Sequence, residues 1–269
     1  MSYPVLLGAV VVTTANQGIR FKEGATTATA AITAGTYYLR GDDSADDLCL
    51  AIKTALEAAT ASTNTYTVSV ARSIDTATAH TLLTVSRATG SDNFQILWAD
   101  ALTTLDIALV GVTASTADNA SDKTSTQACA AGWVSNDILR ELEPFGERLG
   151  NVTRQDNGIV VGVSMSSHMT SWALGFAFVS ESRMLLRRAL AVDADTLEGF
   201  VSRFGPGAAF EIHEVAISSG TTLASATSST LVAKAHWSQA SIESFRPRRI
   251  GAGVPLYDID LVAHERVSA

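Results

Sequence analysis

Alternating apolar and polar positions predict that much of this chain forms β-strands. In the segment Leu256–Ala263, apolar residues fall on one face while Asp258 and Asp260 take the other. The apolar run Pro4–Val12 predicts a buried strand, or two strands broken at Gly8. Further strands are expected at Ala28–Ile32, Thr36–Leu39, Tyr66–Ala71, Thr81–Arg87, Phe94–Trp98, Ala208–Ile217 and Leu231–Trp237.

Two segments have the apolar spacing of a helix that packs one face against a sheet. Leu48, Ile52 and Leu56 recur every four residues, and Ser44 is placed to cap the helix that contains them. A second helix is expected at Leu197–Phe204, directly after an Asp-Thr pair typical of a capping box.

Three other segments are less regular. A short helix is expected over Leu102–Leu109, which ends near a glycine. The segment Asn136–Leu149 also has helical spacing, although Pro144 favours a short helix there. The strands Ile159–Met165 and Trp172–Phe178 are expected to form a hairpin around a Ser/His-rich turn.

These elements predict an α+β, β-rich fold with two parts. A sandwich-like body of antiparallel sheet with one amphipathic helix would consist of residues 1–35 and 130–269. A smaller α+β domain, residues 36–111, would be inserted in it, and the Ala/Ser/Thr-rich residues 112–129 would form a linker or long loop. The alternative is two domains in series, divided near residue 120.

The composition and net charge argue against tight binding of nucleic acid. The 269 residues are 46% hydrophobic and 17% charged, in the range of globular domains, with a net charge of −8. An acidic chain lacks the basic stripe that tight nucleic-acid binding requires. Contact with passing DNA would therefore be non-adhesive, because the acidic surface repels phosphates.

Cysteine usage and apolar runs bear on the compartment. Cys49 and Cys129 do not make a disulfide framework, so both are expected to be reduced. The first residues lack a basic region typical of a signal peptide, and the longest apolar run is too short to cross a bilayer. We therefore expect synthesis in a cytoplasm and no membrane insertion.

No motif for catalysis emerges from the sequence. Phosphate-binding glycine loops and metal-binding His or Cys clusters are lacking, and Ser166–His168 has no nucleophile elbow around it. The acidic pairs lie beside expected helix starts, where they complement the helix dipole. The tripeptide Arg40–Asp42 matches an adhesion motif, but three residues match often by chance. The expectation is a non-enzyme with no catalytic residue, cofactor or metal.

Two stretches resemble structural proteins of tailed bacteriophages. The first comprises Gly35–Leu39, Ser44–Ala58, Tyr66–Ala71, Leu82–Arg87, Phe94–Trp98 and Leu105–Gly111. Its order of strand, helix and strands resembles a small domain of virion proteins of tailed phages and other large double-stranded DNA viruses. The second comprises Trp172, Leu197–Phe200, Phe210, Phe245–Arg248 and Leu256–Leu261. It resembles the β-rich body of phage tail and baseplate subunits.

The resemblance implies a structural subunit of the virion that self-associates into a ring of the tail, as part of the tube, distal tail or baseplate. It implies other virion structural proteins as partners and carries no catalytic residues. The chain is longer than a minimal tail-tube subunit, and residues 112–129 have no counterpart in that class. A head decoration or cement protein is the alternative assembly role.

Two further functions stay open. A receptor- or glycan-binding module of the virion would expose aromatic residues in a cleft, and the candidates are Trp98, Trp133, Trp172 and Trp237. A hydrolase acting on cell-wall or capsule polymers would place two carboxylates across a cleft.

Overall fold

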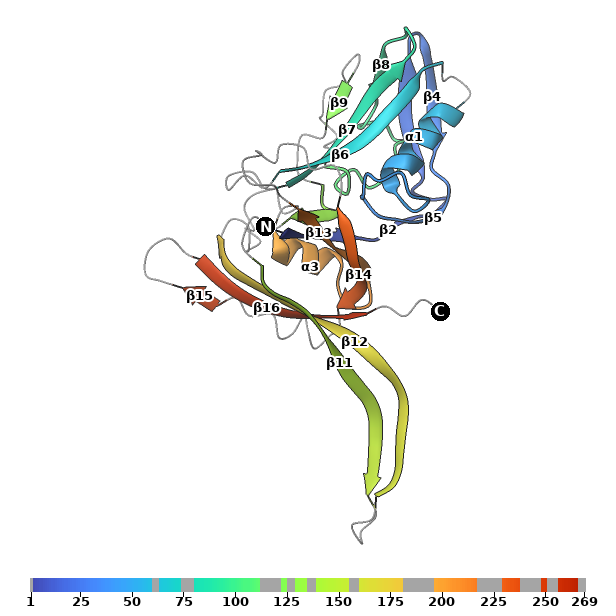
Figure 1. The fold of residues 1–269 in the computed structure, drawn as a ribbon. Helices are drawn as coiled ribbons and strands as arrows, with labels where there is room; N and C mark the ends of the chain where they lie inside the picture. The colour runs from blue at the N-terminus through green and yellow to red at the C-terminus, as the bar shows by residue number, and fades with distance from the viewer. Residues whose placement is uncertain are drawn as a thin grey trace.

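The computed structural model confirms the β-rich α+β fold. It describes residues 2–59, 63–73, 80–111, 122–124, 129–134, 139–154, 160–180, 196–216, 229–237, 248–250 and 256–265. Two parts are visible in Figure 1: a body built on one large sheet, and a smaller unit around helix α1 (Leu48–Ala58), which we call the α1 unit. A long hairpin projects from the body on the side away from the α1 unit.

The body is an eight-stranded antiparallel sheet with the order β10-β1-β13-β14-β16-β12-β11, in which β15 also pairs with β16. The strands are β1 (Ser2–Gly8), β10 (Gly132–Val134), β11 (Leu139–Arg154), β12 (Val160–Ser180), β13 (Ala209–Ala216), β14 (Thr230–Trp237), β15 (Arg248–Ile250) and β16 (Leu256–Glu265). Residues far apart in sequence therefore share one sheet, since β1 pairs with both β10 and β13.

Helix α3 (Leu197–Arg203) covers one face of this sheet. The helix begins at Leu197 as expected, but its cap is Thr196, whose side chain accepts a hydrogen bond from the Gly199 N–H at 3.0 Å. The third helical position is therefore Gly199 and not Glu198, so the expected capping box is not formed. The Phe200 ring meets the Phe210 ring edge-on at 6.1 Å, and Phe210 in turn stacks on Trp237 at 4.4 Å. Aromatic burial of this kind fixes the helix against β13 and β14.

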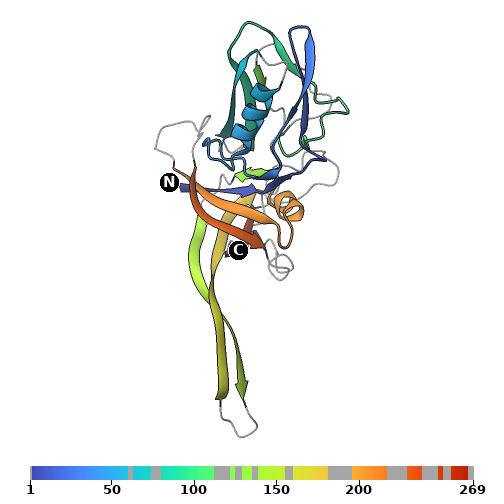
Figure 2. The same ribbon diagram turned by 90° about the vertical axis from the view of Figure 1, so that its right-hand side faces the viewer.

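Three small sheets and α1 make up the α1 unit. The sheets have the orders β4-β3-β8, β6-β7-β9 and β2-β5. Their strands are β2 (Val10–Val12), β3 (Gly18–Glu23), β4 (Thr26–Ala31), β5 (Gly35–Tyr37), β6 (Thr65–Ser73), β7 (His80–Thr89), β8 (Phe94–Ile96) and β9 (Asp122–Thr124). In the view of Figure 2, α1 lies between the strand pair β6–β7 and the β3–β4 hairpin.

Apolar packing is continuous between the two parts. One cluster of buried side chains runs from Leu6 and Phe210 in the body to Ile19 and Leu48 in the α1 unit. The opposite face of β1 is also covered, because Val5 and Leu7 pack with Tyr38. Residues Val5–Leu7 of β1 are thus buried on both faces of the strand, which explains the apolar run there.

The α1 helix differs from its prediction at the N-terminus. The stripe of Leu48, Ile52 and Leu56 is buried as expected. The cap is Asp47 rather than Ser44, and its carboxylate accepts from the Cys49 N–H at 3.0 Å. Both residue types can cap a helix, so sequence did not distinguish between them.

The strands before α1 are placed differently from the prediction. The sequence pattern places residues 1–35 in the body, but in the structure β3 pairs with β8, and β2 pairs with β5. Residues from Val10 onward therefore lie with the α1 unit. Part of the expected linker 112–129 also forms structure, because β9 pairs with β7. Strand pairing depends on long-range contacts that alternation alone does not specify.

Two expected helices are not helices. In Leu102–Leu109 some backbone bonds run three residues back, as from the Leu109 N–H to the Asp106 carbonyl, while the N–H groups of Thr104 and Leu105 donate to the Gly18 carbonyl. The segment therefore forms successive turns and not a helix. In the second, Leu139 to Leu149 belong to strand β11. The apolar spacing of these segments suits a turn or a strand as well as a helix, because short windows fit both periods.

Candidate assembly surfaces and the junction between the two parts

The hairpin β11–β12 is the element that extends farthest from the body. Its inner half belongs to the sheet, since β12 pairs with β16 from Ser171 to Ser180. Its outer half comprises residues 146–154 and 160–170, which pair only with each other among the described residues. We call this outer half the arm. At about 3.3 Å per residue the arm reaches roughly 30 Å beyond the sheet (Figure 1).

The expected hairpin of Ile159–Met165 and Trp172–Phe178 is therefore wrong in detail. Both segments lie on the single strand β12, and their partner is β11. The expected Ser/His turn at Ser166–His168 is instead strand, next to a register shift between Leu149 and Gly150. A β-bulge accommodates the extra residue there without ending the strand.

The base of the arm is firmly anchored in the sheet. The Ser171 hydroxyl and the His264 Nδ1 lie 2.9 Å apart and both residues are buried. Next to them, Leu174 pairs with Leu261, and both side chains are buried. The transition from buried sheet to two-stranded ribbon thus falls at residue 171.

A two-stranded ribbon is marginally stable alone in water. Among the described residues, no strand lies beside either outer edge of the arm. One edge is modified at the base, where Pro144 on β11 pairs with Trp172 and supplies no N–H to a neighbour. A further strand paired along either edge would therefore stabilise the arm.

A cluster of charged side chains joins the α1 unit to the body. Arg40, between β5 and α1, donates from Nε to the Glu211 Oε2 at 2.7 Å and from Nη2 to Oε1 at 2.5 Å. The same guanidinium donates to both carboxylate oxygens of Asp46, at 2.5 and 2.8 Å. Glu211 lies on β13 and is fully buried, so this fork links two parts of the molecule through a charge pair shielded from water.

The charges shift each other's ionisation. Burial alone would raise the pKa of Glu211, but hydrogen bonds from His213 and Arg40 hold that pKa below its ordinary value. Burial likewise acts against the lowered pKa of Asp46, and the bonds from Arg40 outweigh it. The pKa of Arg40 rises, because its two carboxylate partners outweigh its burial. The cluster is therefore fully charged at neutral pH.

His213 extends the cluster from β13 to the start of β14. Its Nε2 lies 2.9 Å from the Glu211 Oε2, and its Nδ1 lies 2.9 Å from the Ser229 hydroxyl. Sequence analysis missed this serine–histidine–carboxylate chain, because its members meet in space. Glu211 is already shared with Arg40, and His213 is only 1% exposed. The chain fixes the imidazole and joins β13 to the start of β14.

A second buried arginine fixes the loop that carries Arg40. Arg72 is 0% exposed, and its Nη2 donates to the carbonyls of Leu39 and Arg40 at 2.7 and 2.9 Å. Farther along the loop, the Asp47 carboxylate accepts from the N–H groups of Asp42 and Asp43 at 2.9 and 3.1 Å. The adhesion tripeptide Arg40–Asp42 is thus built into the junction, since Arg40 is only 8% exposed.

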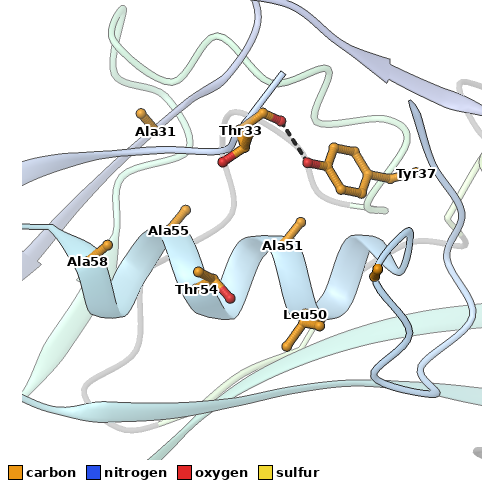
Figure 3. A pocket seen from close by; sticks show the side chains of 9 residues that line it. Ala31, Thr33, Tyr37, Leu50, Ala51, Thr54, Ala55 and Ala58 are labelled. Atoms are coloured by element: carbon orange, nitrogen blue, oxygen red, sulfur yellow. Dashed lines mark hydrogen bonds between the residues drawn. The ribbon is translucent and has the colours of Figure 1, made fainter. Parts of the chain in front are cut away.

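A shallow groove runs beside α1 in the α1 unit, with a volume of about 220 Å³. Figure 3 shows small side chains on its two sides: Ala51, Thr54, Ala55 and Ala58 from the helix, and Ala31 and Thr33 from the end of β4 and the segment after it. The Tyr37 hydroxyl closes one end by donating to the Thr33 carbonyl at 2.8 Å. None of the residues that line the groove is charged, and the larger ones are Tyr37 and Leu50.

The other expected features are distributed as follows. Trp98, Trp133 and Trp237 are buried, and Trp172 is half-buried, so they do not form the exposed aromatic cleft of a glycan-binding module. Cys49 and Cys129 are buried and not bonded to each other, and burial raises the pKa of the Cys49 thiol. Of the acidic pairs, Asp193 and Asp195 lie outside the described residues.

Within the described ranges, no three His, Cys, Asp or Glu side chains gather in a way that could hold a metal ion. The helices described are also too short or too polar to span a membrane. Comparison of the chain with protein-family models, with curated proteins and with solved structures found no match.

Proposed function

We propose that this protein is a structural subunit of a tailed phage particle. Copies would associate into a ring of the tail, as part of the tube, distal tail or baseplate, together with other virion structural proteins. Its work would be done by shape and repeated contact rather than by reactive side chains. It would be made in the bacterial cytoplasm and reside in the virion.

The observation that carries the proposal is the arm. A ribbon of two strands reaching roughly 30 Å from its sheet has little to stabilise it within one chain. In an assembly, a neighbouring copy would cover it and bury its edges. A long projecting hairpin therefore fits a chain that is completed by its neighbours.

Two further features support the same role. The buried fork from Arg40 to Glu211 resists relative movement of the two parts, which suits a repeated building block. The net charge of −8 gives an acidic surface, and a ring lined by such surface would let DNA pass without adhesion.

The test is removal of the arm. Phe145 and Ser171 are paired across the two strands, so residues 146–170 can be replaced by Asn-Gly, a two-residue turn that closes a hairpin at this pair. Purified wild-type and shortened chains are compared by light scattering and electron microscopy. We expect rings or filaments from the wild type and none from the shortened chain.

A folding control accompanies this comparison. The urea midpoint of the shortened chain should match that of the wild type, because the anchoring pairs Ser171–His264 and Leu174–Leu261 remain. If the shortened chain folds and still forms the wild-type assemblies, the arm is not the assembly element. If the wild type remains a monomer at all concentrations and binds a glycan, the alternative role of a binding module is favoured.

A further inference from the structure

The outer edge of β4 is open. This strand pairs only with β3 among the described residues. Thr29 lies opposite Arg20 on β3. The Arg20 N–H donates to the Thr103 hydroxyl, and the Arg20 carbonyl accepts from the Leu97 N–H, so both backbone groups of Arg20 point away from β4. Thr29 is therefore in a non-hydrogen-bonded pair, and its own N–H and carbonyl face the open side.

The same alternation applies to its neighbours on the strand. Gly18 lies opposite Ala31. Its N–H donates to the Thr104 hydroxyl, and its carbonyl accepts from the N–H groups of Thr104 and Leu105. Because the pattern repeats every second residue, Thr27, Thr29 and Ala31 present a row of backbone donors and acceptors at the edge. All three residues are exposed.

This edge lacks the features that usually prevent pairing between chains. Native edge strands carry lysine, proline, an inward charge or a bulge. Strand β4 has the sequence Thr-Thr-Ala-Thr-Ala-Ala, and its register with β3 has no shift. The whole stretch from Gly24 to Leu39 is uncharged. By contrast, the edge strand β11 contains Pro144, several charged residues and register shifts.

We propose that this edge pairs with the same edge of a second copy of the chain. The strands would run antiparallel about a two-fold axis at Thr29, which places Thr29 opposite Thr29 of the partner subunit and Thr27 opposite Ala31 of the partner subunit. Threonine pairs across strands are favourable. Strand β4 has no charged residue of its own, and the charge next to Thr29 is the Arg20 guanidinium, which donates to the Thr29 hydroxyl at 2.9 Å. In a chain of net charge −8, a strand without acidic side chains limits the repulsion between two copies.

The groove beside α1 accommodates the rest of the partner strand. Continuing the same register places Ala25 of the partner subunit opposite Thr33, at the mouth of the groove (Figure 3). The side chains on the helix side of the groove include the small residues Ala51 and Ala55, and the bulky group nearest to Thr33 is Tyr37, whose hydroxyl donates to the Thr33 carbonyl at 2.8 Å.

A two-fold contact closes after two copies. It therefore differs from the contact that continues a ring, and it involves no residue of the arm. The proposal stands or fails independently of the function proposed above.

Cysteine trapping in the full chain tests the register. Thr29→Cys places two thiols opposite each other at the axis, within the Cα separation that a disulfide spans. Thr27→Cys is the matched control, because it lies on the same exposed edge but four residues away from its own copy. The native cysteines are buried. Under mild oxidation we expect a covalent dimer from Thr29→Cys and at least ten-fold less from Thr27→Cys. Equal yields, or none from either, would overturn the proposal.

A second variant tests the contact without a covalent bond. Thr29→Lys places like charges in register, and we expect the dimer in sedimentation experiments to weaken at least ten-fold. Thr230→Lys, an exposed threonine on β14, should leave it unchanged. An unchanged Thr29→Lys dimer excludes β4 pairing. The same measurement is made on the shortened chain, which lacks residues 146–170. If that chain forms a dimer that Thr29→Lys weakens, the edge contact is supported even when rings are lost. If it is strictly monomeric, the edge contact is contradicted.

Discussion

The junction and the arm differ in whether their polar groups find partners within the chain. At the junction, Arg40, Glu211 and Asp46 bind one another within the chain. In the arm, two strands pair with each other and leave their outer edges without a neighbour among the described residues. Under the proposed function, the junction would hold the two parts of each copy together and the arm would be the element that contacts other copies. Substitutions at the junction should therefore change the free energy of unfolding, and changes to the arm should alter association between copies.

The largest effect on stability is expected at the junction. Arg40→Met leaves the Glu211 carboxylate buried without its main partner, at a cost of about 3–5 kcal/mol in the free energy of unfolding. The double variant Arg40→Met/Glu211→Met removes both buried charges and should cost less than Arg40→Met alone. Urea denaturation measures both. A double variant at least as unstable as Arg40→Met would mean that the pair is not coupled as described.

A smaller effect is expected from packing at the end of β1. A Cβ added at Gly8 would lie 2.0 Å from Cζ of the buried Phe204 ring, so Gly8→Ala must displace that ring. We expect a loss of about 1–3 kcal/mol. Gly205→Ala is the control, because its Cβ would meet only the Ser202 carbonyl oxygen at 3.8 Å. Equal stability of the two variants would show that Phe204 moves freely.

The pH dependence follows from the lowered pKa of Glu211. A carboxylate with a lowered folded-state pKa contributes stability above its ordinary value, here 4.5, and loses that contribution as the pH falls through the folded-state value. The free energy of unfolding of the wild type should therefore fall steeply as the pH drops below 4.5. Asp42 and Asp46, whose pKa values are also lowered, should add to this loss. In Glu211→Gln the slope should be shallower. Parallel curves for the two proteins would exclude Glu211 as a source of the dependence.

The smallest effect is expected at a surface ion pair. Arg203 and Asp106 are 2.9 Å apart, and their side chains are 39% and 48% exposed. Because water screens this pair, Arg203→Met should change the free energy of unfolding by less than about 1 kcal/mol. A loss as large as that of Arg40→Met would show that exposure does not separate these two pairs.

Much of the fold could be predicted from local pattern. The stripe of Leu48, Ile52 and Leu56, the start of a helix at Leu197 and the start of a strand at Leu256 all depend on neighbours in sequence. Strand partners could not be predicted in this way. The pairing of β3 with β8 and the continuous course of β12 depend on contacts between distant residues.

The junction was also beyond sequence reasoning. Arg40 and Glu211 are 171 residues apart, and each has an ordinary alternative role as a surface charge. Only the fold brings them together and buries them. The Ser229–His213–Glu211 chain was missed for the same reason, since alternation places Glu211 and His213 on one strand face without indicating what lies opposite.

Hydrogen–deuterium exchange tests the central role of the arm most directly. In dilute solution, where copies are separate, we expect the amides of residues 146–154 and 160–170 to exchange faster than those of the inner hairpin, which has a third strand beside it. On assembly these arm amides should become protected, while the inner hairpin changes little. If assemblies form and the arm continues to exchange as it does in dilute solution, the arm is not the surface that joins the copies.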